Sequence, residues 1–154
     1  MCAIVDANVA GRFFDSPPDP ELLPLWKWID DGKGVLVVGG RLLDELEAIK
    51  RAAEVIRTWA QAGLVGLVPK EEVEAETRAV EATGRCVSDD EHIIALARAS
   101  GARLLCSADQ SLHADFRNRE LISDPRGAIY QNSSHTHLLV PWRGCRFKAP
   151  GDNR

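Results

Sequence analysis

Short apolar runs alternate with longer stretches of helical periodicity along most of this chain, and no other feature of the sequence restricts the fold as strongly. The runs expected to form strands cover residues 3–5, 35–38, 64–68 and 102–106. Stretches with apolar residues at helical spacing separate them. Such an alternation predicts an α/β fold. We therefore expect a three-layer α/β/α sandwich with a mostly parallel central sheet.

Turn and capping signals divide the helical stretches. Glycines follow several of them, and Pro69 opens another at a position where its missing N–H is tolerated. Helices are expected over 21–31, 41–50, 52–62, from 69 onward and from 88–90 to 100, with short ones near 13–14 and within 107–116. Short strands are also expected at 128–130 and 137–140. The 154 residues fit a single domain, 1–154, with a loose tail over 141–154.

The composition argues against several classes of protein. The formal net charge of -4 gives no support for nonspecific nucleic-acid binding. No run approaches the roughly 18 apolar residues of a membrane-spanning helix, and Asp6 falls too early for a secretory signal. We therefore expect a cytoplasmic protein with no membrane partner. The cysteines lack metal-binding spacing and are expected to be reduced thiols: Cys2, Cys86, Cys106 and Cys145.

Acidic residues recur near the strand ends that a parallel sheet brings to one edge. Asp6 follows the first strand and Asp109 follows the fourth. Two pairs of neighbouring acids, Asp44–Glu45 and Asp89–Asp90, lie after the second strand and at the start of the helix before the fourth. Each acid alone has a structural explanation, as a helix cap or an exposed residue. Their convergence favours a site, because ligands bind at this edge of open α/β sheets.

A cluster of carboxylates also restricts the chemistry of such a site. Carboxylates without cations repel one another, so the cluster needs a metal ion or a retained proton. Hard carboxylate oxygens suit Mg²⁺ or Mn²⁺. A metal of this kind activates water and stabilises the leaving oxygen in phosphodiester hydrolysis.

The segments that carry these acids resemble the PIN domain family. The family's first strand ends in an Asp two residues before Asn or Ser, as in Ile4–Asn8 (IVDAN). Leu43–Leu46 (LDEL) is similar to its second acidic position, and Asp90–Ala97 (DEHIIALA) to its third. Leu104–Asp109 (LLCSAD) resembles the fourth, a strand followed by Ser or Thr, one residue and Asp. The resemblance covers roughly residues 3–116.

The resemblance implies a Mg²⁺- or Mn²⁺-dependent endoribonuclease whose substrate is RNA. Many members are toxins of toxin–antitoxin pairs, so the expected partners are RNA, an antitoxin protein and a second copy of the chain in a homodimer. Carried over by position, the catalytic and metal-binding residues are Asp6, Glu45, Asp90 and Asp109, supported by Asn8 and Ser107. Residues 121–154 extend beyond the motifs and receive no role.

Helical geometry separates the two acids near the start of the helix that ends at residue 100. At about 100° per residue, the apolar face set by residues 93–97 lies nearer Asp90 than Asp89. We therefore expect Asp90 to face the site and Asp89 or Ser88 to cap the helix.

The basic residues give weaker signals. Three arginines are expected to offset phosphate charge: Arg12, Arg41 and Arg117. His135 and His137 share a face if their segment is a strand, but they lack a third metal ligand. His92 is expected to pack at a helix edge, although it lies close enough to Asp90 to approach the acids. His113 and Asp115 form a pair with no nucleophile near it.

Two other functions start from the same residues. A receiver or dehalogenase-like phosphoryl-transfer domain also has an Asp after its first strand, but it needs a Lys after a later one. No Lys lies between Lys70 and Lys148, and Asn8 stands where the dehalogenase-like pattern has a second Asp. The remaining alternative is a catalytically silent module of the same fold that acts through protein or RNA contacts. A metal titration distinguishes it from an enzyme.

Overall fold

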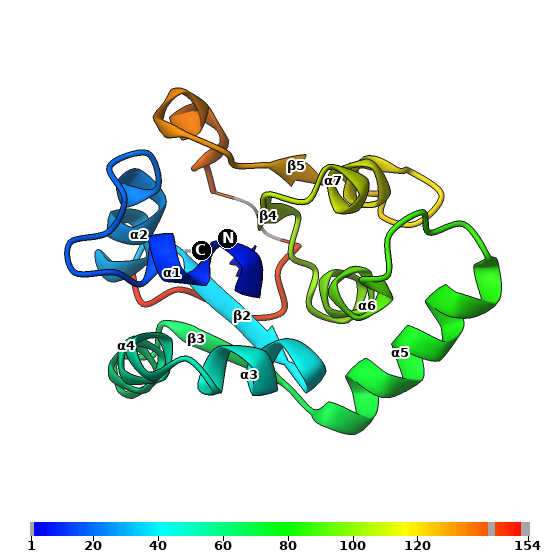
Figure 1. The fold of residues 1–154 in the computed structure, drawn as a ribbon, viewed down its shortest axis with the longest axis horizontal. Coiled ribbons are helices and arrows are strands. Elements are labelled where there is room, and N and C mark those ends of the chain that lie inside the picture. The colour runs from blue at the N-terminus through cyan, green and yellow to red at the C-terminus, as the bar shows by residue number, and fades with distance from the viewer. Residues whose placement is uncertain (1, 142–143, 152–154) are drawn as a thin grey trace.

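The computed structural model describes residues 2–141 and 144–151. Its centre is a five-stranded sheet in which all pairings are parallel, in the order β3-β2-β1-β4-β5 (Figure 1). The strands are β1 (Cys2–Val5), β2 (Val35–Gly39), β3 (Val65–Val68), β4 (Leu104–Cys106) and β5 (Ala128–Ile129). Helices cover both faces of the sheet. The predicted class, an α/β/α sandwich with a parallel sheet, is confirmed.

The helices follow the expected pattern, with ends shifted by a few residues. They are α1 (Ala10–Phe13), α2 (Leu23–Asp30), α3 (Gly40–Glu47), α4 (Lys50–Gln61), α5 (Lys70–Thr83), α6 (Glu91–Ser100) and α7 (Gln110–Arg117), with 3₁₀ turns η1 (Ala7–Val9) and η2 (Ser133–Leu138). Helices α2 and α4 lie on one side of the sheet and α6 and α7 on the other (Figure 1), and α5 packs against α6.

One predicted strand is wrong. The sequence pattern predicts extended backbone at 137–140, but residues 133–138 form η2 instead. The side chain of Asn132 accepts a hydrogen bond from the backbone N–H of Ser134 and caps this turn. Asn and Ser side chains bond locally to the backbone, which favours a turn over a strand.

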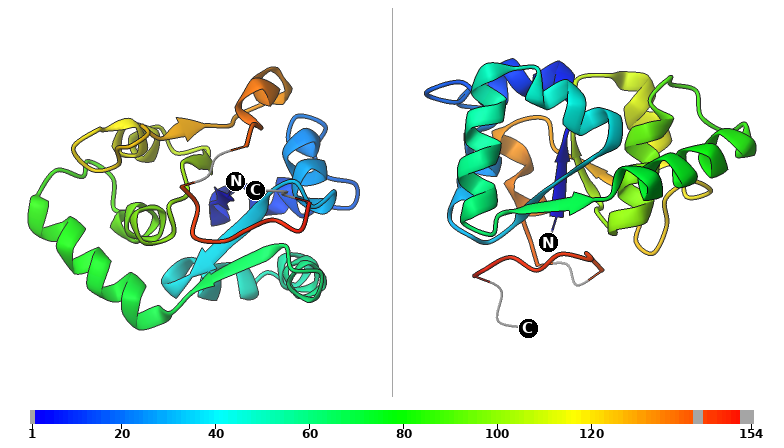
Figure 2. Two further views of the ribbon diagram at one scale, coloured as in Figure 1. Left: turned by 180° about the vertical axis from the view of Figure 1, so that it is seen from behind. Right: turned by 90° about the horizontal axis from the view of Figure 1, so that it is seen from below.

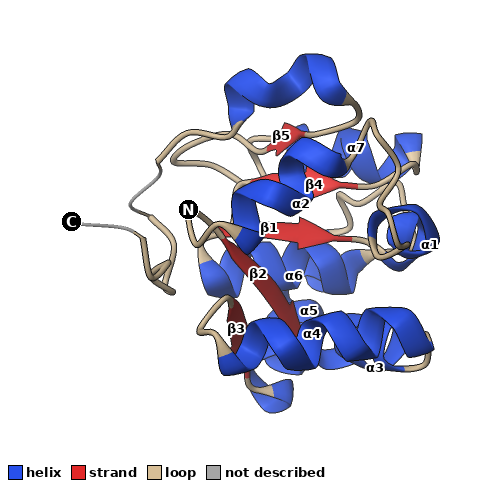
Figure 3. Ribbon diagram, turned by 90° about the vertical axis from the view of Figure 1, so that its left-hand side faces the viewer, coloured by secondary structure: helices blue, strands red, loops and turns tan. Residues whose placement is uncertain are grey.

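The central strands have no solvent-facing side. All residues of β1 and β2 are buried, because helices cover both faces. β3 forms one edge of the sheet and differs, since Leu67 is 56% exposed. The polarity of the strands brings their carboxyl ends to one edge, where β1, β4 and β5 all point toward α1 (Figure 3).

Pairing of β1 with β4 determines which residues meet at that edge. Val5 is in register with Cys106, and the N–H of Asp6 donates to the carbonyl of Cys106 at 2.9 Å. The residues that follow the two strands, Asp6 and Ser107, are therefore neighbours. Beside them, Gly40 turns the chain from β2 directly into α3 with φ of +55°, a conformation that favours glycine.

The two ends of the described chain meet at the opposite edge of the sheet. Cys2 and Cys145 form a disulfide with a Cα–Cα distance of 5.9 Å. The expectation that all four cysteines are free thiols is therefore wrong for this pair. Spacing along the chain does not reveal the pairing, because 143 residues separate the two cysteines and only the fold brings them together. Cys86 and Cys106 are free, and burial raises their pKa values to about 11 and about 12, so both remain thiols at neutral pH.

Part of the tail expected to be loose, 141–154, falls on residues outside the described ones. The described segment 144–151 crosses the sheet at the end where β1 begins (Figure 2). Arg146 N–H donates to the Ser100 carbonyl, and Gly151 N–H donates to the Gly32 carbonyl, both at 2.8 Å. Within the described residues, no helix is long and apolar enough to cross a membrane.

Cys145→Ser is expected to lower the free energy of unfolding by about 3 kcal/mol, because the disulfide closes a long loop and restricts the unfolded chain. Urea denaturation without reductant measures the change. Cys86→Ser is the matched control, since that thiol is free, and it should shift the free energy of unfolding by less than about 1 kcal/mol. Equal urea midpoints for Cys145→Ser and the unmodified protein would contradict a stabilising disulfide.

Candidate carboxylate site

Ser107 organises the edge of the sheet between β1 and β4. Its hydroxyl donates to Asp6 Oδ2 at 2.9 Å, and it accepts from the Asn8 amide at 3.3 Å and from the Asp109 N–H at 3.1 Å. The Asn8 Oδ1 atom in turn accepts from the Ala108 N–H at 3.2 Å. Asp6 is buried, and although it precedes η1 its side chain caps no helix. Its carboxylate is therefore oriented by Ser107 and faces the edge.

Asp109 contributes a second carboxylate but also caps α7. Its Oδ1 atom accepts from the Ser111 N–H at 2.9 Å and the Ser111 hydroxyl at 2.7 Å, and more weakly from the Leu112 N–H at 3.4 Å. The Ser111 hydroxyl, with these backbone N–H groups, holds the pKa of Asp109 below its usual value. Asp109 is therefore ionised. It caps α7 and also lies beside the other acids.

Asp90 meets Asp6 and Asp109 from the start of α6. Burial raises its pKa from the ordinary 3.8 to about 6, and the charges of Asp6 and Asp109 and a hydrogen bond with the Asp109 side chain contribute to this rise. The bond has Asp90 as the protonated partner and Asp109 as the acceptor. Three acids from different parts of the chain thus interact electrostatically at one edge.

The expected capping of α6 needs a correction. The helix begins at Glu91, so Asp90 itself is the N-cap residue, and neither Asp89 nor Ser88 is. The Asp90 side chain accepts no capping hydrogen bond, because it is turned toward Asp109 instead. Asp89 is exposed on the far side of the turn and lines an adjacent cavity. Asp90 thus interacts with Asp6 and Asp109, and its part in metal binding stays a prediction.

Glu45 reaches the same region from α3, whereas its neighbour Asp44 is exposed. Glu45 Oε1 lies 3.3 Å from His92 Nε2 and 3.7 Å from Arg41 Nε. Neither Glu45 Oε1 nor His92 Nε2 is aligned for a hydrogen bond, and among the described residues these are the buried side-chain polar atoms that lack a partner. Buried polar atoms are normally hydrogen-bonded, so a carboxylate oxygen held by ion-pair contacts alone can accept a further ligand.

His92 is more closely involved than expected. The sequence pattern places it at the helix edge, but it is 7% exposed and its ring touches Glu45. Burial lowers its pKa, and the nearby Arg41 lowers it further, while Glu45 and Asp6 act in the opposite direction. His92 therefore contacts Glu45 and interacts electrostatically with Asp6, which relates the α3 acid to those at the strand ends. The position of His92 two residues after Asp90 is the only sequence signal for this contact.

Two buried residues of α7 support the acid edge, and the sequence pattern did not identify either role. Asp115 Oδ1 accepts from the Val87 N–H at 2.9 Å, and its Oδ2 accepts from the N–H and hydroxyl of Ser88 at 2.9 and 2.5 Å. This carboxylate fixes the loop that leads to Asp90. His113 Nε2 contacts the Ser107 carbonyl at 2.5 Å and fixes the end of β4.

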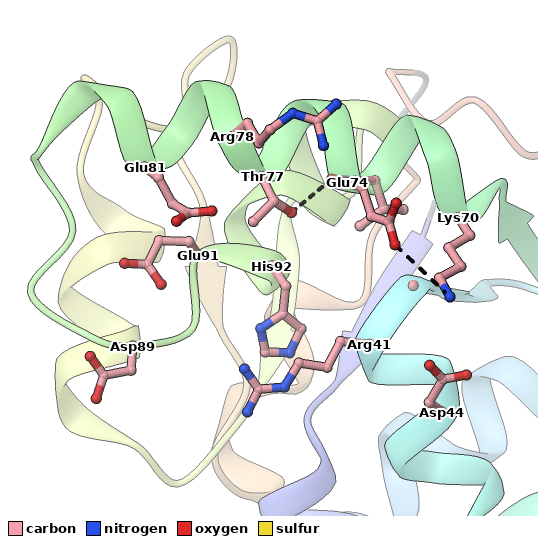
Figure 4. A pocket seen from close by; sticks show the side chains of 12 residues that line it. Arg41, Asp44, Lys70, Glu74, Thr77, Arg78, Glu81, Asp89, Glu91 and His92 are labelled. Atoms are coloured by element: carbon pink, nitrogen blue, oxygen red, sulfur yellow. Dashed lines mark hydrogen bonds and ion pairs between the residues drawn. The ribbon is translucent and has the colours of Figure 1, made fainter.

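An open cavity of about 540 Å³ adjoins the site between α3, α5 and α6 (Figure 4). Arg41 and His92 lie side by side in its wall (Figure 4), and both approach Glu45. The ionisable residues that line it are Arg41, Asp44, Lys70, Glu74, Arg78, Glu81, Asp89, Glu91 and His92. Acids outnumber the lysine and arginine side chains, so this cavity does not favour a phosphate chain.

Asp6, Asp90 and Asp109 thus interact at one strand edge, and Glu45 approaches them through His92. We call these four predicted acids the acid site: Asp6, Glu45, Asp90 and Asp109. Of the arginines expected to offset phosphate charge, Arg12 is paired with Asp19 at 2.9 Å, Arg41 adjoins the acid site, and Arg117 lies at the far end of α7. Across residues 2–141 and 144–151, no three His, Cys, Asp or Glu side chains are already grouped closely enough to hold a metal ion.

The donors of the acid site still suit a divalent ion. All four are carboxylates, the ligands that Mg²⁺ and Mn²⁺ prefer. Burial and acidic neighbours raise the pKa of Asp90 to about 6, and Glu45 Oε1 is buried without a hydrogen bond. A divalent cation would satisfy both groups at once.

Asp90→Asn is expected to stabilise the metal-free protein at pH 7 by about 1 kcal/mol. The folded pKa of about 6 lies above the unfolded value, so the contribution of Asp90 to stability is fully present below about pH 4 and is lost as the pH rises through 6. A shift of two units corresponds to about 3 kcal/mol, which partial solvation of the carboxylate reduces. Thermal denaturation in EDTA at pH 4 and pH 7 measures it: the variant should melt roughly 2–4 °C higher at pH 7 and equally at pH 4. The exposed Asp89→Asn is the control, and a lower melting temperature for Asp90→Asn at pH 7 would contradict the expected repulsion.

No protein-family model matches the chain, and no curated protein matches it significantly in sequence. In structure, the chain is similar to a chain of VapBC2 from Rickettsia felis, crystallised with a DNA fragment from their promoter. The two chains are 13% identical, the match covers 86% of this chain and 99% of the other, and the TM-score is 0.48. A likeness of this degree carries no argument about function.

Proposed function

We propose that this protein is a metal-dependent endoribonuclease that hydrolyses RNA phosphodiester bonds with Mg²⁺ or Mn²⁺. The observation that carries the proposal is the acid site. Asp6 and Asp109 follow adjacent parallel strands, and their charges add to burial in raising the pKa of Asp90 to about 6. A structural cluster of acids gains nothing from such repulsion, whereas a cation-binding site uses it.

Each residue has a distinct part in this proposal. Asp6, Glu45, Asp90 and Asp109 would hold the ion. When bound, the ion supplies charge stabilisation at the phosphate and lowers the pKa of a water molecule. Ser107 holds the Asp6 carboxylate in place, and Asn8 fixes the turn that carries Asp109. Arg41, which borders the acid site, offsets the charge of a bound phosphate.

The resemblance of the four motifs to PIN domains supports RNA as the substrate. The same resemblance is the ground for proposing a role as the toxin of a toxin–antitoxin pair, with an antitoxin protein as partner. A homodimer is a further proposal on that ground. A silent module of the same fold remains the alternative, and it predicts neither cleavage nor metal binding.

Metal-dependent stability tests the proposal together with cleavage. Millimolar Mn²⁺ should raise the melting temperature by several degrees, because the ion binds the native state alone. Asp6→Asn should remove most of that rise, whereas Asp44→Asn, an exposed neighbouring acid, should keep it. Single-stranded RNA should be cleaved with Mn²⁺ or Mg²⁺ and remain intact in EDTA. Cleavage that persists in EDTA would rule out the metal mechanism, and the absence of both cleavage and a Mn²⁺ effect would favour the silent module.

A further inference from the structure

We infer that a second cavity, at the opposite end of α7 from the acid site, is a phosphate-binding subsite that holds the backbone of the RNA substrate. This inference rests on the proposed function. The cavity has a volume of about 460 Å³ and lies between the end of α7, β5 and η2. Its ionisable lining consists of Arg117, Arg126, His135 and His137, and we call it the basic cavity.

The charge of the basic cavity is unusual for this protein. The chain as a whole has a net charge of -4, and the cavity beside the acid site is lined mainly by acids. No acidic residue is among the described residues that line the basic cavity. Two guanidinium groups and two imidazoles therefore face one hollow without a carboxylate to neutralise them, which favours an anionic ligand.

The arginines of the basic cavity have hydrogen-bond donors to spare. In the part of the chain that the structure describes, neither Arg117 nor Arg126 forms an ion pair. Arg126 Nε donates to the Arg117 carbonyl at 2.9 Å, which orients that guanidinium and leaves its terminal nitrogens free of this bond. Guanidinium groups bind phosphate oxygens through two parallel N–H bonds, so an oriented pair of arginines suits a phosphate group.

The histidines add donors and argue against a metal. His135 Nδ1 accepts from the Gln131 N–H at 3.0 Å, so the neutral ring carries its proton on Nε2 and presents a donor. The rings of His135 and His137 lie edge to face with centroids 6.2 Å apart. Because His135 Nδ1 is already occupied and no carboxylate or thiol is among the described residues that line the cavity, a divalent metal finds too few ligands there.

The position of the basic cavity relates it to the acid site. Helix α7 begins directly after Asp109 and ends at Arg117, so its eight residues separate the two sites by about 12 Å along the helix. This distance is short enough for one short segment of RNA to reach both sites. An RNA strand that follows α7 would place one phosphate at the acid site and another in the basic cavity.

The binding of single-stranded RNA in EDTA tests the subsite without cleavage. Arg117→Gln/Arg126→Gln should weaken binding about tenfold at 0.15 M salt. It should also reduce the slope of log affinity against log salt concentration by about 0.7 for each phosphate that the variant no longer binds. The matched control is Lys33→Gln/Arg57→Gln, two exposed cationic residues on other surfaces without ion pairs among the described residues, which removes the same charge. It should change affinity less than twofold, and circular dichroism confirms that both variants fold.

Inorganic phosphate provides a readout that depends on neither RNA nor a metal. Millimolar phosphate should shift the NMR signals of the His135 and His137 rings in a saturable manner, and the shifts should vanish in Arg117→Gln/Arg126→Gln.

Equal loss of RNA affinity in this variant and the control would overturn the inference, as would an affinity loss confined to double-stranded DNA. If the protein cleaves RNA but this variant binds and cleaves normally, the subsite is wrong and the proposed function stands. If RNA binding depends on the basic cavity but no metal supports cleavage, the proposed function fails and the subsite stands.

Discussion

Asp90→Asn is expected to reduce metal-dependent RNA cleavage by about a hundredfold or more, whereas Asp89→Asn should change it less than threefold. A metal ion contributes several kcal/mol of charge stabilisation to phosphodiester hydrolysis, and each 1.36 kcal/mol is a factor of ten in rate. Asp90 interacts with both Asp6 and Asp109, while Asp89 is exposed on the other side of the turn. Although the two acids are adjacent in sequence, only one of them belongs to the acid site.

Single-turnover cleavage of a labelled RNA measures both variants under the same conditions. The Asp90→Asn protein is expected to be folded and slightly more stable without metal, so a loss of activity cannot be ascribed to unfolding. Glu45→Gln, which keeps size and polarity but removes the charge, should show a loss of similar magnitude. If Asp89→Asn were inactive and Asp90→Asn active, the assignment of the acid site at the start of α6 would be wrong.

Asp115→Ala is expected to lower the free energy of unfolding by about 3 kcal/mol and the melting temperature by roughly 6–12 °C. The substitution leaves the buried N–H of Ser88 and the N–H of Val87 without an acceptor. Because these groups hold the loop before Asp90, cleavage by the remaining folded protein should also decrease. Thermal denaturation and cleavage below the melting transition measure the two effects separately.

Ser88→Ala distinguishes the loop anchor from a general effect of core mutations. It removes one of the three hydrogen bonds to Asp115 and the long bond from the Asp90 N–H to the Ser88 hydroxyl at 3.3 Å. Both backbone bonds to Asp115 remain, so the free energy of unfolding should fall by only about 1 kcal/mol. If Asp115→Ala melted as the unmodified protein does, the carboxylate would not be the anchor of this loop.

The parts of the molecule that depend on local pattern could be predicted from the sequence. Buried strands followed by helices define the parallel sheet, and parallel strands necessarily bring the residues after β1 and β4 to one edge. The proximity of Asp6, Ser107 and Asp109 follows from that rule. The choice of Glu45 over Asp44 came from the resemblance to a family, and the assignment of metal ligands stays a prediction.

The remaining features depend on which segments pack together, and local pattern does not contain that information. In the sequence, Asp115 is one of two charged residues on a short helix, yet its side chain is 2% exposed because the loop at 87–88 folds over it. The disulfide between Cys2 and Cys145 depends on the return of the chain to β1. The strand predicted at 137–140 failed for a local reason. Capping by Asn132 favoured a 3₁₀ turn over the strand that the apolar residues of this segment suggest.

The order of the strands also determines when the acid site exists during synthesis. β1 is made first, yet its neighbour β4 and the Ser107 hydroxyl that holds Asp6 come 101 residues later. At about 5–20 residues per second, the ribosome needs roughly 5–20 s to make that stretch. Throughout this interval a nascent chain contains Asp6 but lacks the group that orients it and the complete set of neighbouring carboxylates. A nascent chain therefore lacks any activity of the acid site. Activity can begin only after β4 has left the ribosome and paired with β1.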